Sequence, residues 1–194
     1  MPRQPDPLLE ERILCAAQKL WKKGGGKALT MRAVARAAGT NTPAVYRRFR
    51  NREEILRALL KRLQREISTV VGSCRSPEEA CEQYLEFALR HPHEYELFYE
   101  HSHQLHQPRQ PGRVVPLREQ RPTMALMEAK LAERLGGSPP DHTRVSLALW
   151  AVTHGTAMIL ISKSVPAEHA EAVRLAFRAA VENTIRNASY FSTR

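Results

Sequence analysis

Four arginines close together are the residues of this 194-residue chain whose chemistry is easiest to interpret. They lie in the segment GTNTPAVYRRFRNREEIL, residues 39–56, which contains only two acidic side chains, Glu53 and Glu54. The four are Arg47, Arg48, Arg50 and Arg52. A guanidinium group is a planar fork of N–H donors that fits a phosphate group or the edge of a guanine base. The segment therefore predicts a surface that binds a polyanion.

The net charge of +10 is concentrated at one end of the sequence. Residues 1–65 contain 16 Lys and Arg against 5 Asp and Glu, whereas the remaining residues contain 14 against 15. This asymmetry indicates nucleic acid as the first candidate partner and an anionic membrane surface as the second. A membrane-surface protein would account for the charge but not for the helical spacing described below, so we expect DNA and no membrane.

The histidines offer a possible metal site. Five of the eight histidines crowd into residues 91–106, where Glu94 and Glu100 could assist. They are His91, His93, His101, His103 and His106. No two of them are four residues apart, the spacing that brings two imidazoles onto one helix face. We expect no obligatory metal and no cofactor, and keep a metal-responsive repressor as the alternative. The three cysteines, Cys15, Cys74 and Cys81, are expected to be buried free thiols in a cytoplasmic protein.

Other classes of function find little support. The chain has no nucleophile elbow, paired carboxylates or nucleotide-binding glycine loop, so we expect no enzymatic activity. KGGGK, residues 23–27, follows no strand and reads as the end of a helix. The apolar run 145–162 is interrupted by His154 and Gly155, which favours a buried helix of a bundle over a membrane span.

The elements around the arginines have clear start and stop signals. Residues 13–21 have helical apolar spacing, and the three glycines end that helix. Thr30 caps a short helix, Gly39 leaves it with positive φ, and Asn41 or Thr42 caps the next helix with Pro43 in its first turn. Val45 and Phe49 face inward. This order predicts a helix-turn-helix whose outer face presents Thr42, Ala44, Arg47 and Arg48 to a DNA groove.

The rest of the chain is predicted to be helical. A long helix runs over 53–70, and Ser76–Pro77–Glu78 and Pro92 begin the next two. Residues 107–122 read as a mobile connection rich in Pro, Arg and Gln. Helices follow over about 123–135, 141–162 and 167–190. The fold class is all-α, with a DNA-binding domain over 1–52 and a ligand-binding and dimerisation domain over 53–194.

The segment LTMRAVARAAGTNTPAVYRRFRNREEIL resembles the DNA-binding segment of the tetracycline-repressor-like (TetR) family, over about residues 8–60. The resemblance implies phosphate contacts from Thr30 and Arg32, and base-edge or backbone contacts from the start of the third helix. The latter residues are Asn41, Thr42, Pro43 and Ala44. Tyr46 corresponds to the family tyrosine that reaches a phosphate, and Arg47 to a residue that reads guanine or binds phosphate. Arg48 stands where many relatives have histidine, and Arg52 where lysine is usual.

A second resemblance lies near the C-terminus. ALWAVTHGTAMIL, with Trp150, His154 and Gly155, is similar to a Trp-x-x-x-His-Gly element of one class of C-terminal domains in this family. In that class the last two long helices form a dimer interface. The resemblance and the apolar stripe of the final helix place Gly155, Val173, Phe177 and Val181 in this interface.

Aromatic and Met side chains between the two ends suit an apolar or aromatic effector. The candidates are Tyr84, Phe87, Tyr95, Phe98, Tyr99, Met124, Met127, Trp150 and His154. The sequence thus predicts a homodimeric, ligand-responsive regulator, most simply a repressor that leaves a palindromic double-stranded operator when a small molecule binds.

Overall fold

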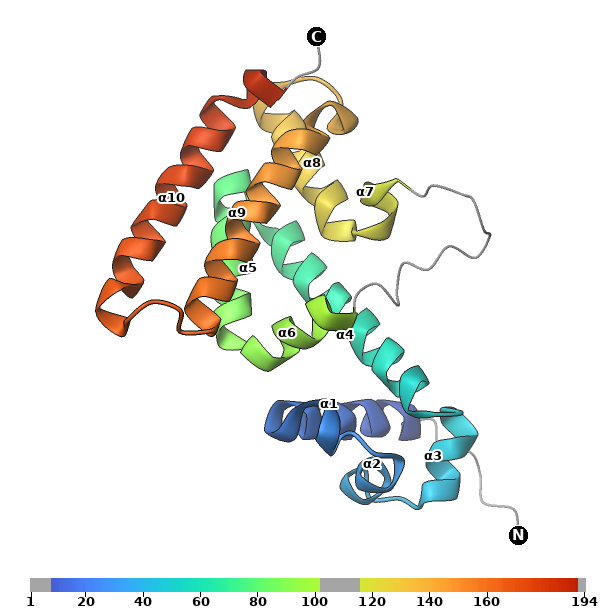
Figure 1. Ribbon diagram of the computed structural model, residues 1–194. Coiled ribbons are helices and arrows are strands. Elements are labelled where there is room, and N and C mark those ends of the chain that lie inside the picture. The colour runs from blue at the N-terminus through green and yellow to red at the C-terminus, as the bar shows by residue number, and fades with distance from the viewer. Residues whose placement is uncertain (1–7, 102–115, 192–194) are drawn as a thin grey trace. The chain divides into compact units, whose positions relative to one another are not determined.

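The computed structural model describes residues 8–101 and 116–191, and within these ranges every regular element is a helix (Figure 1). The all-α prediction is therefore confirmed. By packing, the chain divides into two compact units. Unit 1 comprises the described residues up to Leu63 together with His93–His101, and unit 2 comprises 64–92 and 116–191.

Unit 1 contains four helices, the beginning of a longer one and no other regular element in its described part. They are α1 (Leu9–Ala28), α2 (Met31–Ala37), α3 (Thr42–Arg48), the first turns of α4 (Arg52–Ser73) and α6 (Pro92–His101). The division differs from the expected boundary after residue 52. The apolar side chains of α4 as far as Leu63, and Leu97 and Phe98 of α6, belong to the same buried cluster as α1 to α3.

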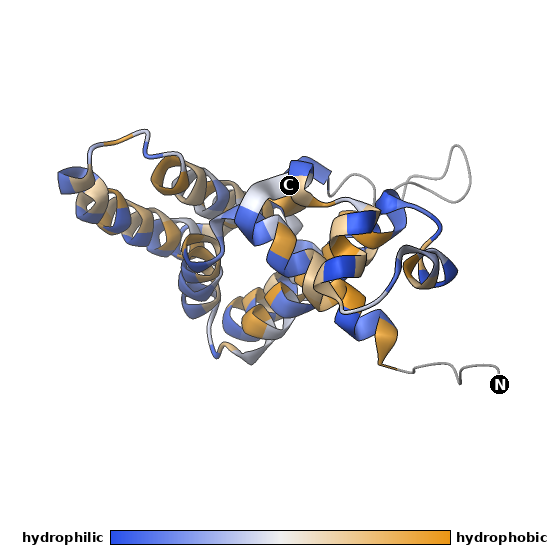
Figure 2. Cartoon of the chain, turned by 90° about the horizontal axis from the view of Figure 1, so that it is seen from below, coloured by the Kyte–Doolittle hydropathy of each residue, from blue (hydrophilic) through white to orange (hydrophobic). Residues whose placement is uncertain are grey.

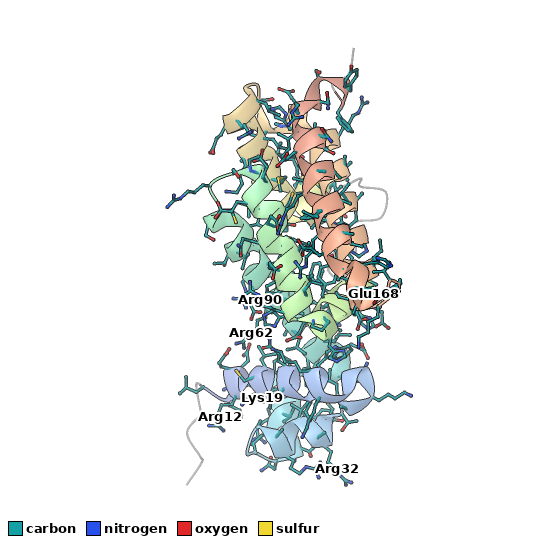
Figure 3. The ribbon with its side chains drawn as sticks, turned by 90° about the vertical axis from the view of Figure 1, so that its left-hand side faces the viewer. Arg12, Lys19, Arg32, Arg62, Arg90 and Glu168 are labelled. Carbon is teal, nitrogen blue, oxygen red and sulfur yellow. The ribbon has the colours of Figure 1, made fainter. Side chains whose placement is uncertain are left out.

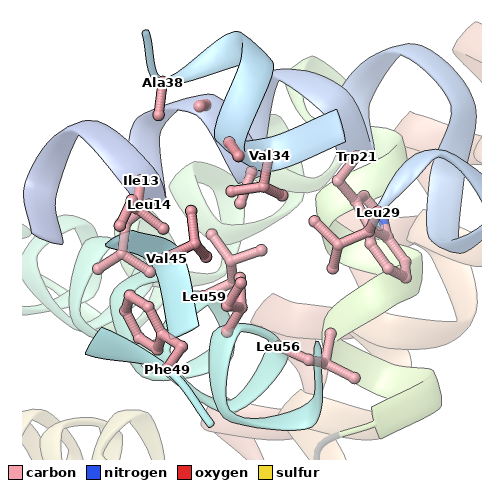
Figure 4. Packing of buried hydrophobic residues seen from close by; sticks show 14 of the residues in the cluster. Ile13, Leu14, Trp21, Leu29, Val34, Ala38, Val45, Phe49, Leu56 and Leu59 are labelled. Atoms are coloured by element: carbon pink, nitrogen blue, oxygen red, sulfur yellow. The ribbon is translucent and has the colours of Figure 1, made fainter. Parts of the chain in front are cut away.

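Every helix of unit 1 contributes apolar side chains to one buried cluster, part of which is drawn in Figure 4. Ile13, Val34, Val45 and Leu56 are fully buried in it. Trp21 adds a hydrogen bond, from its indole Nε1 to the carbonyl oxygen of His93 at 3.2 Å. The inward positions expected for Val45 and Phe49 of α3 are thus confirmed.

The three glycines end the regular part of α1 as predicted, although one short turn follows them. Gly24 and Gly25 leave helical geometry, with φ of −151° and +58°, before the chain resumes a turn up to Ala28. A positive φ is adopted readily by glycine, because a side chain would clash there. The kink lets the segment that precedes α2 fold back beside Trp21.

Unit 2 is built from the remaining helices. They are the end of α4, α5 (Pro77–Arg90), α7 (Leu117–Gln120), α8 (Pro122–Leu135), α9 (Thr143–Ile161) and α10 (Ala170–Arg186). Short 3₁₀ turns η2 (Pro139–His142), η3 (Ala167–His169) and η4 (Ala188–Phe191) flank the last two. Both hydrophobic and hydrophilic residues occur along the helices (Figure 2); α5 and α10 have an apolar and a polar side, whereas α9 is apolar over most of its surface. The expected connection 107–122 is partly wrong, because α7 occupies four of its residues; residues 107–115 lie outside the described part.

Helix α9 is the centre of unit 2, since it packs against α5, α8 and α10. With η2 it forms the segment Pro139–Ile161, which is long and apolar enough by length and composition to cross a membrane. A core helix of a bundle meets the same criterion, and Val145, Leu149 and Ala157 of α9 are buried in this way.

Two predicted interface residues turn out to belong to the core of unit 2. Phe177 and Val181 of α10 are only 2% and 3% exposed within a single chain. Ion pairs hold α10 in this orientation, with Arg174 on Glu86 at 2.6 Å and Arg178 on Glu82 at 2.7 Å, both acids from α5. The stripe that we assigned to a partner subunit therefore covers α5 and α9 instead. The exposed large apolar residue of α10 is Leu175.

Truncating Phe49 should destabilise unit 1 strongly. Phe49 is 6% exposed at the end of α3, so Phe49→Ala leaves a cavity and should lower the free energy of unfolding by about 3–5 kcal/mol. Tyr46→Phe, in the same helix but half exposed, should change it by less than about 0.5 kcal/mol. Urea denaturation followed by Trp21 fluorescence, in a Trp150→Phe background, measures both. A loss below about 1 kcal/mol for Phe49→Ala would contradict this packing.

Candidate nucleic-acid interface and ligand cavity

Helix α2 begins at a side-chain cap. Thr30 has extended backbone angles, and its hydroxyl oxygen accepts a hydrogen bond from the backbone N–H of Ala33 at 3.1 Å. The hydroxyl hydrogen remains able to donate outward, because the cap uses only an oxygen lone pair. Thr30 and Arg32 are both exposed, and Figure 3 shows Arg32 at the surface of α2. The structure thus presents both predicted phosphate contacts at the start of one helix.

The turn between α2 and α3 has a geometry that requires glycine. Gly39 has φ of +65° and donates to the carbonyl of Arg36 at 3.2 Å, while Thr40 donates to the carbonyl of Ala35 at 3.0 Å. This pair of bonds is the Schellman arrangement that closes a helix C-terminus. Asn41 follows at once as the cap of α3, its Oδ1 accepting from the N–H of Ala44 at 2.9 Å. One tight turn therefore fixes the start of α3 relative to α2.

The outer face of α3 carries polar and basic side chains. Pro43, Tyr46, Arg47 and Arg48 are exposed, and Tyr46 retains 51% of its surface. Positions three and four apart lie on one helix face, so Pro43, Tyr46 and Arg47 share a side. They form, with Asn41 and Thr42, a continuous surface at the start of the helix.

Ala44 departs from the prediction. Its side chain is 5% exposed and belongs to the buried cluster with Val45, so it does not face a base edge. It sits one position before Val45 and one after Pro43, on the side of α3 that packs against the rest of unit 1. A small side chain lets α3 approach closely, which is a packing role.

Arg52 also differs from what we expected. Its Nε donates to the carbonyl oxygen of Leu29 at 3.0 Å, and one Nη donates to the carbonyl of Gly26 at 3.1 Å. The other Nη contacts Glu53 at 3.2 Å. The guanidinium thus ties the start of α4 to the segment just before Thr30. A Cβ added to Gly26 would lie 3.1 Å from the guanidinium and 3.2 Å from the Trp21 ring, so a larger residue there would require these side chains to shift slightly.

A cavity opens in unit 2 between α4, α5, α8 and α9. It encloses about 430 Å³ of space free of atoms, including the open solvent at its mouth. Four predicted effector-contact residues line it: Tyr84, Met124, Met127 and Trp150. Val71, Ala80 and Leu149 add further apolar side chains to the wall.

Five other predicted effector residues do not line the cavity. Tyr95, Phe98 and Tyr99 lie on α6 in unit 1, where Phe98 belongs to the core cluster and Tyr99 packs against it. Phe87 is buried in unit 2 and contacts the ring of His91, with centroids 4.9 Å apart. His154 stacks on Trp150 from within α9. Aromatic residues fill cores as readily as cavities, so composition could not separate the two groups.

Several cavity residues were missed by the sequence reasoning. Arg121 precedes α8, and its Cζ lies 4.7 Å from the centre of the Trp150 ring. The hydroxyl-bearing Thr123, Ser146 and Thr153 also line the wall. Isolated Ser and Thr in a helix have no distinctive sequence signal. The sequence gives one signal for Arg121: it stands immediately before Pro122, which begins α8, and a residue at a helix start lies near the end of the helix bundle.

The electrostatics of the cavity are set by Arg121 and by burial. The pKa of His154 is lowered, first because the ring is partly buried and second because Arg121 is close. Burial also raises the pKa of the Cys81 thiol to about 12. Cys81 therefore stays protonated at neutral pH and is a poor nucleophile.

The histidine-rich segment is only partly described. His91 packs on Phe87, and His93 is 3.7 Å from Glu96 in the next turn. His101 is near Glu100, and its ring and that of Trp21 form a T-shaped pair. His103 and His106 lie outside the described residues. Within the described ranges no three His, Cys, Asp or Glu side chains form a group able to hold a metal ion.

Changing Arg52 should affect stability and not only surface charge. Arg52→Lys keeps the charge, but an ammonium cannot reach both carbonyl oxygens as a planar fork does, so unfolding should become easier by about 1–3 kcal/mol. Arg57→Lys, the same change on the same helix at an exposed site, should cost less than about 0.5 kcal/mol. Thermal and urea unfolding measure the difference. Equal stability of the two variants would show that the contacts to Gly26 and Leu29 contribute nothing.

Comparison with known proteins agrees with this architecture. The family described as "Bacterial regulatory proteins, tetR family" matches residues 13–59, and "Tetracyclin repressor-like, C-terminal domain" matches residues 78–184. No curated protein sequence gives a significant match.

Solved structures share the fold along nearly the whole chain. A protein of unknown function from Rhodococcus sp. RHA1 has a TM-score of 0.68 at 22% identity, covering 96% of this chain and 98% of its own. A TetR variant from Acinetobacter baumannii AYE, in complex with minocycline, has a TM-score of 0.65 at 16% identity, covering 98% and 100%. A TetR-like transcriptional regulator from Rhodococcus sp. RHA1 has 0.61 at 19%, covering 95% and 99%. Together with the two family matches, which span both units, these findings show that the chain belongs to the tetracycline-repressor-like (TetR) family of bacterial regulatory proteins.

Proposed function

We propose that this protein is a cytoplasmic, homodimeric repressor that binds a palindromic operator and leaves it when a small molecule occupies the cavity of unit 2. The observation that carries the proposal is the face formed by the starts of α2 and α3. There Thr30, Arg32, Tyr46 and Arg47 are exposed beside a turn fixed by Gly39. Side chains of this kind bind phosphate and read base edges when a helix enters the major groove.

The roles that we propose for the individual side chains follow from their exposure and their position in the helices. Thr30, Arg32 and Tyr46 suit phosphate oxygens, because they lie at helix starts or carry an outward hydroxyl. Asn41 keeps its amide N–H groups for a base or phosphate, since only its oxygen serves the cap. Thr42, Pro43 and Arg47 are the candidates for base contact, and Arg48 for base or backbone. Arg52 acts indirectly, by holding the segment that ends at Thr30.

Helix α4 is the element through which we propose that ligand binding changes DNA binding. Its last turns contribute Val71 to the cavity wall, and its first turns contribute Leu56 and Leu59 to the core of unit 1. A ligand that favours a different placement of Val71 would shift the whole 22-residue helix. It releases DNA only if it binds the non-DNA-binding state more tightly, since equal affinity shifts no population. Two proteins of similar fold were solved with small molecules, the TetR variant with minocycline and the multidrug binding protein EbrR with imidazole, and both support a small-molecule effector.

Dimerisation is proposed through the outer faces of α9 and α10. Ala151, Gly155 and Ile159 are four residues apart and so share one face of α9, where Ile159 is 39% exposed. Leu175 of α10 is 56% exposed. A Cβ added to Gly155 would meet nothing within 4 Å in its own chain, which leaves room for a partner helix. Of the residues first assigned here, Gly155 and half-buried Val173 remain candidates.

The DNA-binding proposal predicts a steep dependence on salt. A duplex selected from a random library should be a palindrome, and its affinity should fall with log salt by a slope of about 0.9 per phosphate contact. Tyr46→Phe should weaken binding several-fold on all sequences. Arg47→Ala should cost about 1–3 kcal/mol, and at a guanine contact it should relax specificity at one base pair. Arg144→Ala, an exposed charge on α9, is the control. Salt-independent binding, or no preferred duplex, would refute the proposal.

The dimer proposal predicts that a charge at Leu175 separates the subunits. Leu175→Glu and Ile159→Glu should each yield monomers in sedimentation velocity and lose operator binding, because a buried unpaired carboxylate is unfavourable at an interface. Leu135→Glu is the matched control, an apolar residue 41% exposed at the end of α8. Helix content by circular dichroism should be unchanged in all three. Unchanged dimers in both variants would place the interface elsewhere.

A further inference from the structure

One side of helix α9 lines the cavity of unit 2. Four of its residues belong to the wall and share a helix face, because they follow one another at offsets of three, four and seven positions. They are Ser146, Leu149, Trp150 and Thr153. Residues seven positions apart are separated by about 10 Å along a helix axis. Two hydroxyl groups therefore stand at the ends of this face, with two large apolar side chains between them.

The hydroxyl of Ser146 is buried but poorly satisfied. The residue is 1% exposed, and its hydroxyl donates to the sulfur of Met124 at 2.7 Å. A thioether is a weak acceptor, so this bond replaces only part of the hydration that burial removes. A ligand oxygen is a stronger acceptor, and the Ser146 oxygen keeps its lone pairs for a ligand donor. This end of the wall favours a ligand group that can accept as well as donate.

The hydroxyl of Thr153 is used differently. Thr153 is 3% exposed, and its hydroxyl donates at 2.7 Å to the carbonyl oxygen of Leu149, four residues earlier in the same helix. The hydrogen is committed to the backbone, whereas the oxygen lone pairs remain able to accept. The Cys81 thiol of the same wall stays protonated, because burial raises its pKa to about 12 against an opposing hydrogen bond from Thr153. This end of the wall favours a ligand donor.

The surface between the two hydroxyls suits an apolar body with neutral ends. Val71 of α4, Ala80 of α5 and Met127 of α8 line the cavity together with Leu149. Among the described residues no Asp or Glu lines it, so a ligand ammonium would lose hydration without gaining a counter-charge. An ionised carboxylate only accepts hydrogen bonds, so it would meet the lone pairs of Thr153 without a proton to share. A hydroxyl fits both ends, because it donates and accepts.

We propose that the cavity binds a neutral diol or bisphenol, an apolar body with a hydroxyl group at each end, one paired with Ser146 and the other with Thr153. At Ser146 the ligand oxygen takes the place of the Met124 sulfur as acceptor. At Thr153 the ligand hydroxyl donates to the threonine oxygen. The inference rests on the proposed function only in taking this cavity as the effector site. Each ligand hydroxyl contributes about fivefold to the affinity, which corresponds to one net hydrogen bond.

The test compares ligands that share a biphenyl skeleton. Biphenyl-4,4′-diol carries its hydroxyls at opposite ends, biphenyl-2,2′-diol has the same composition with its hydroxyls close together, and 4-phenylphenol lacks one of them. 4,4′-Dimethoxybiphenyl keeps both oxygens but cannot donate. Isothermal titration of the DNA-free protein at neutral pH should give biphenyl-4,4′-diol an affinity about fivefold or more above that of each of the other three.

Variants of the two hydroxyl residues identify the ends. Ser146→Ala and Thr153→Val should each lower the affinity for biphenyl-4,4′-diol about fivefold, and in the double variant it should bind no better than 4-phenylphenol. Ser162→Ala is the control. Its hydroxyl makes the same kind of bond, to the carbonyl oxygen of Met158 at 2.6 Å, but it is exposed and lies outside the cavity. Circular dichroism checks that each variant is folded.

Three results would each overturn the inference. They are equal affinities of the two diols, equal affinities of biphenyl-4,4′-diol and 4-phenylphenol, and no binding of biphenyl-4,4′-diol. These comparisons use the unmodified protein, so they remain decisive if a substitution prevents folding. Affinity for biphenyl-4,4′-diol that is unchanged in the folded double variant would also overturn it.

A mobility-shift assay with the selected operator separates this inference from the proposed function. Release of DNA by 4-phenylphenol or 4,4′-dimethoxybiphenyl, at concentrations where biphenyl-4,4′-diol has no effect, would uphold the regulator and reject the diol. Biphenyl-4,4′-diol that binds through Ser146 and Thr153 yet leaves the operator bound would support the diol site and reject ligand-induced release.

Discussion

The burial of Val34 and Val45 against α1 and α4 is the constraint on which the rest of this protein depends. Helices α2 and α3 have seven residues each, too few for a helix to persist alone in water. They exist because their apolar sides close a core with Ile13 and Leu59. The exposed face that we assign to DNA is the reverse side of this packing. Its shape is consequently as rigid as the core of unit 1.

The arginines of the first unit divide into two groups for a physical reason. Arg47 stands on the outer side of α3, where solvent surrounds it. Arg52 stands at the first turn of α4, within reach of two carbonyl oxygens that the kinked end of α1 turns toward it. A backbone carbonyl that is partly buried needs a donor, and a guanidinium supplies two in one plane. Two arginines a few residues apart thus have different surroundings: Arg47 is exposed on the face that we propose for DNA, and Arg52 holds two segments of the fold together.

Unit 2 contains a comparable division between packing and binding. Ion pairs from Arg174 and Arg178 hold α10 on α5, which places Phe177 in the core and Leu175 outside. Oε1 of buried Glu128 accepts a hydrogen bond from the Thr143 hydroxyl, and its Oε2 lies 3.4 Å from Nε of Arg118, so the acid of α8 serves the fold beside α7. Arg121 is different, because it lies at the cavity wall over Trp150. Among the described residues that line the cavity, Arg121 is therefore the one that carries a charge.

Local signals in the sequence determined the elements. The caps at Thr30, Asn41 and Ser76, the turn at Gly39 and the proline starts are short-range devices, so they could be read from neighbouring residues and were found where expected. The family resemblance and the all-α class followed from the same spacings. The sequence also showed that the excess positive charge lies in the first third of the chain, because charges can be counted residue by residue without knowing the fold.

Only the tertiary structure decided which of several similar side chains faces the cavity, the core or the solvent. Tyr84 lines a cavity and Tyr95 fills a core, although both are aromatic residues on helices of similar composition. Phe177 faces inward and Leu175 outward in the orientation in which α10 packs on α9 and α5, and these long-range contacts are contained in no local window of the sequence. The same holds for Arg52, whose partners precede it by more than twenty residues. Periodicity marks the apolar side of a helix, but the neighbours that cover that side are fixed by packing between distant segments.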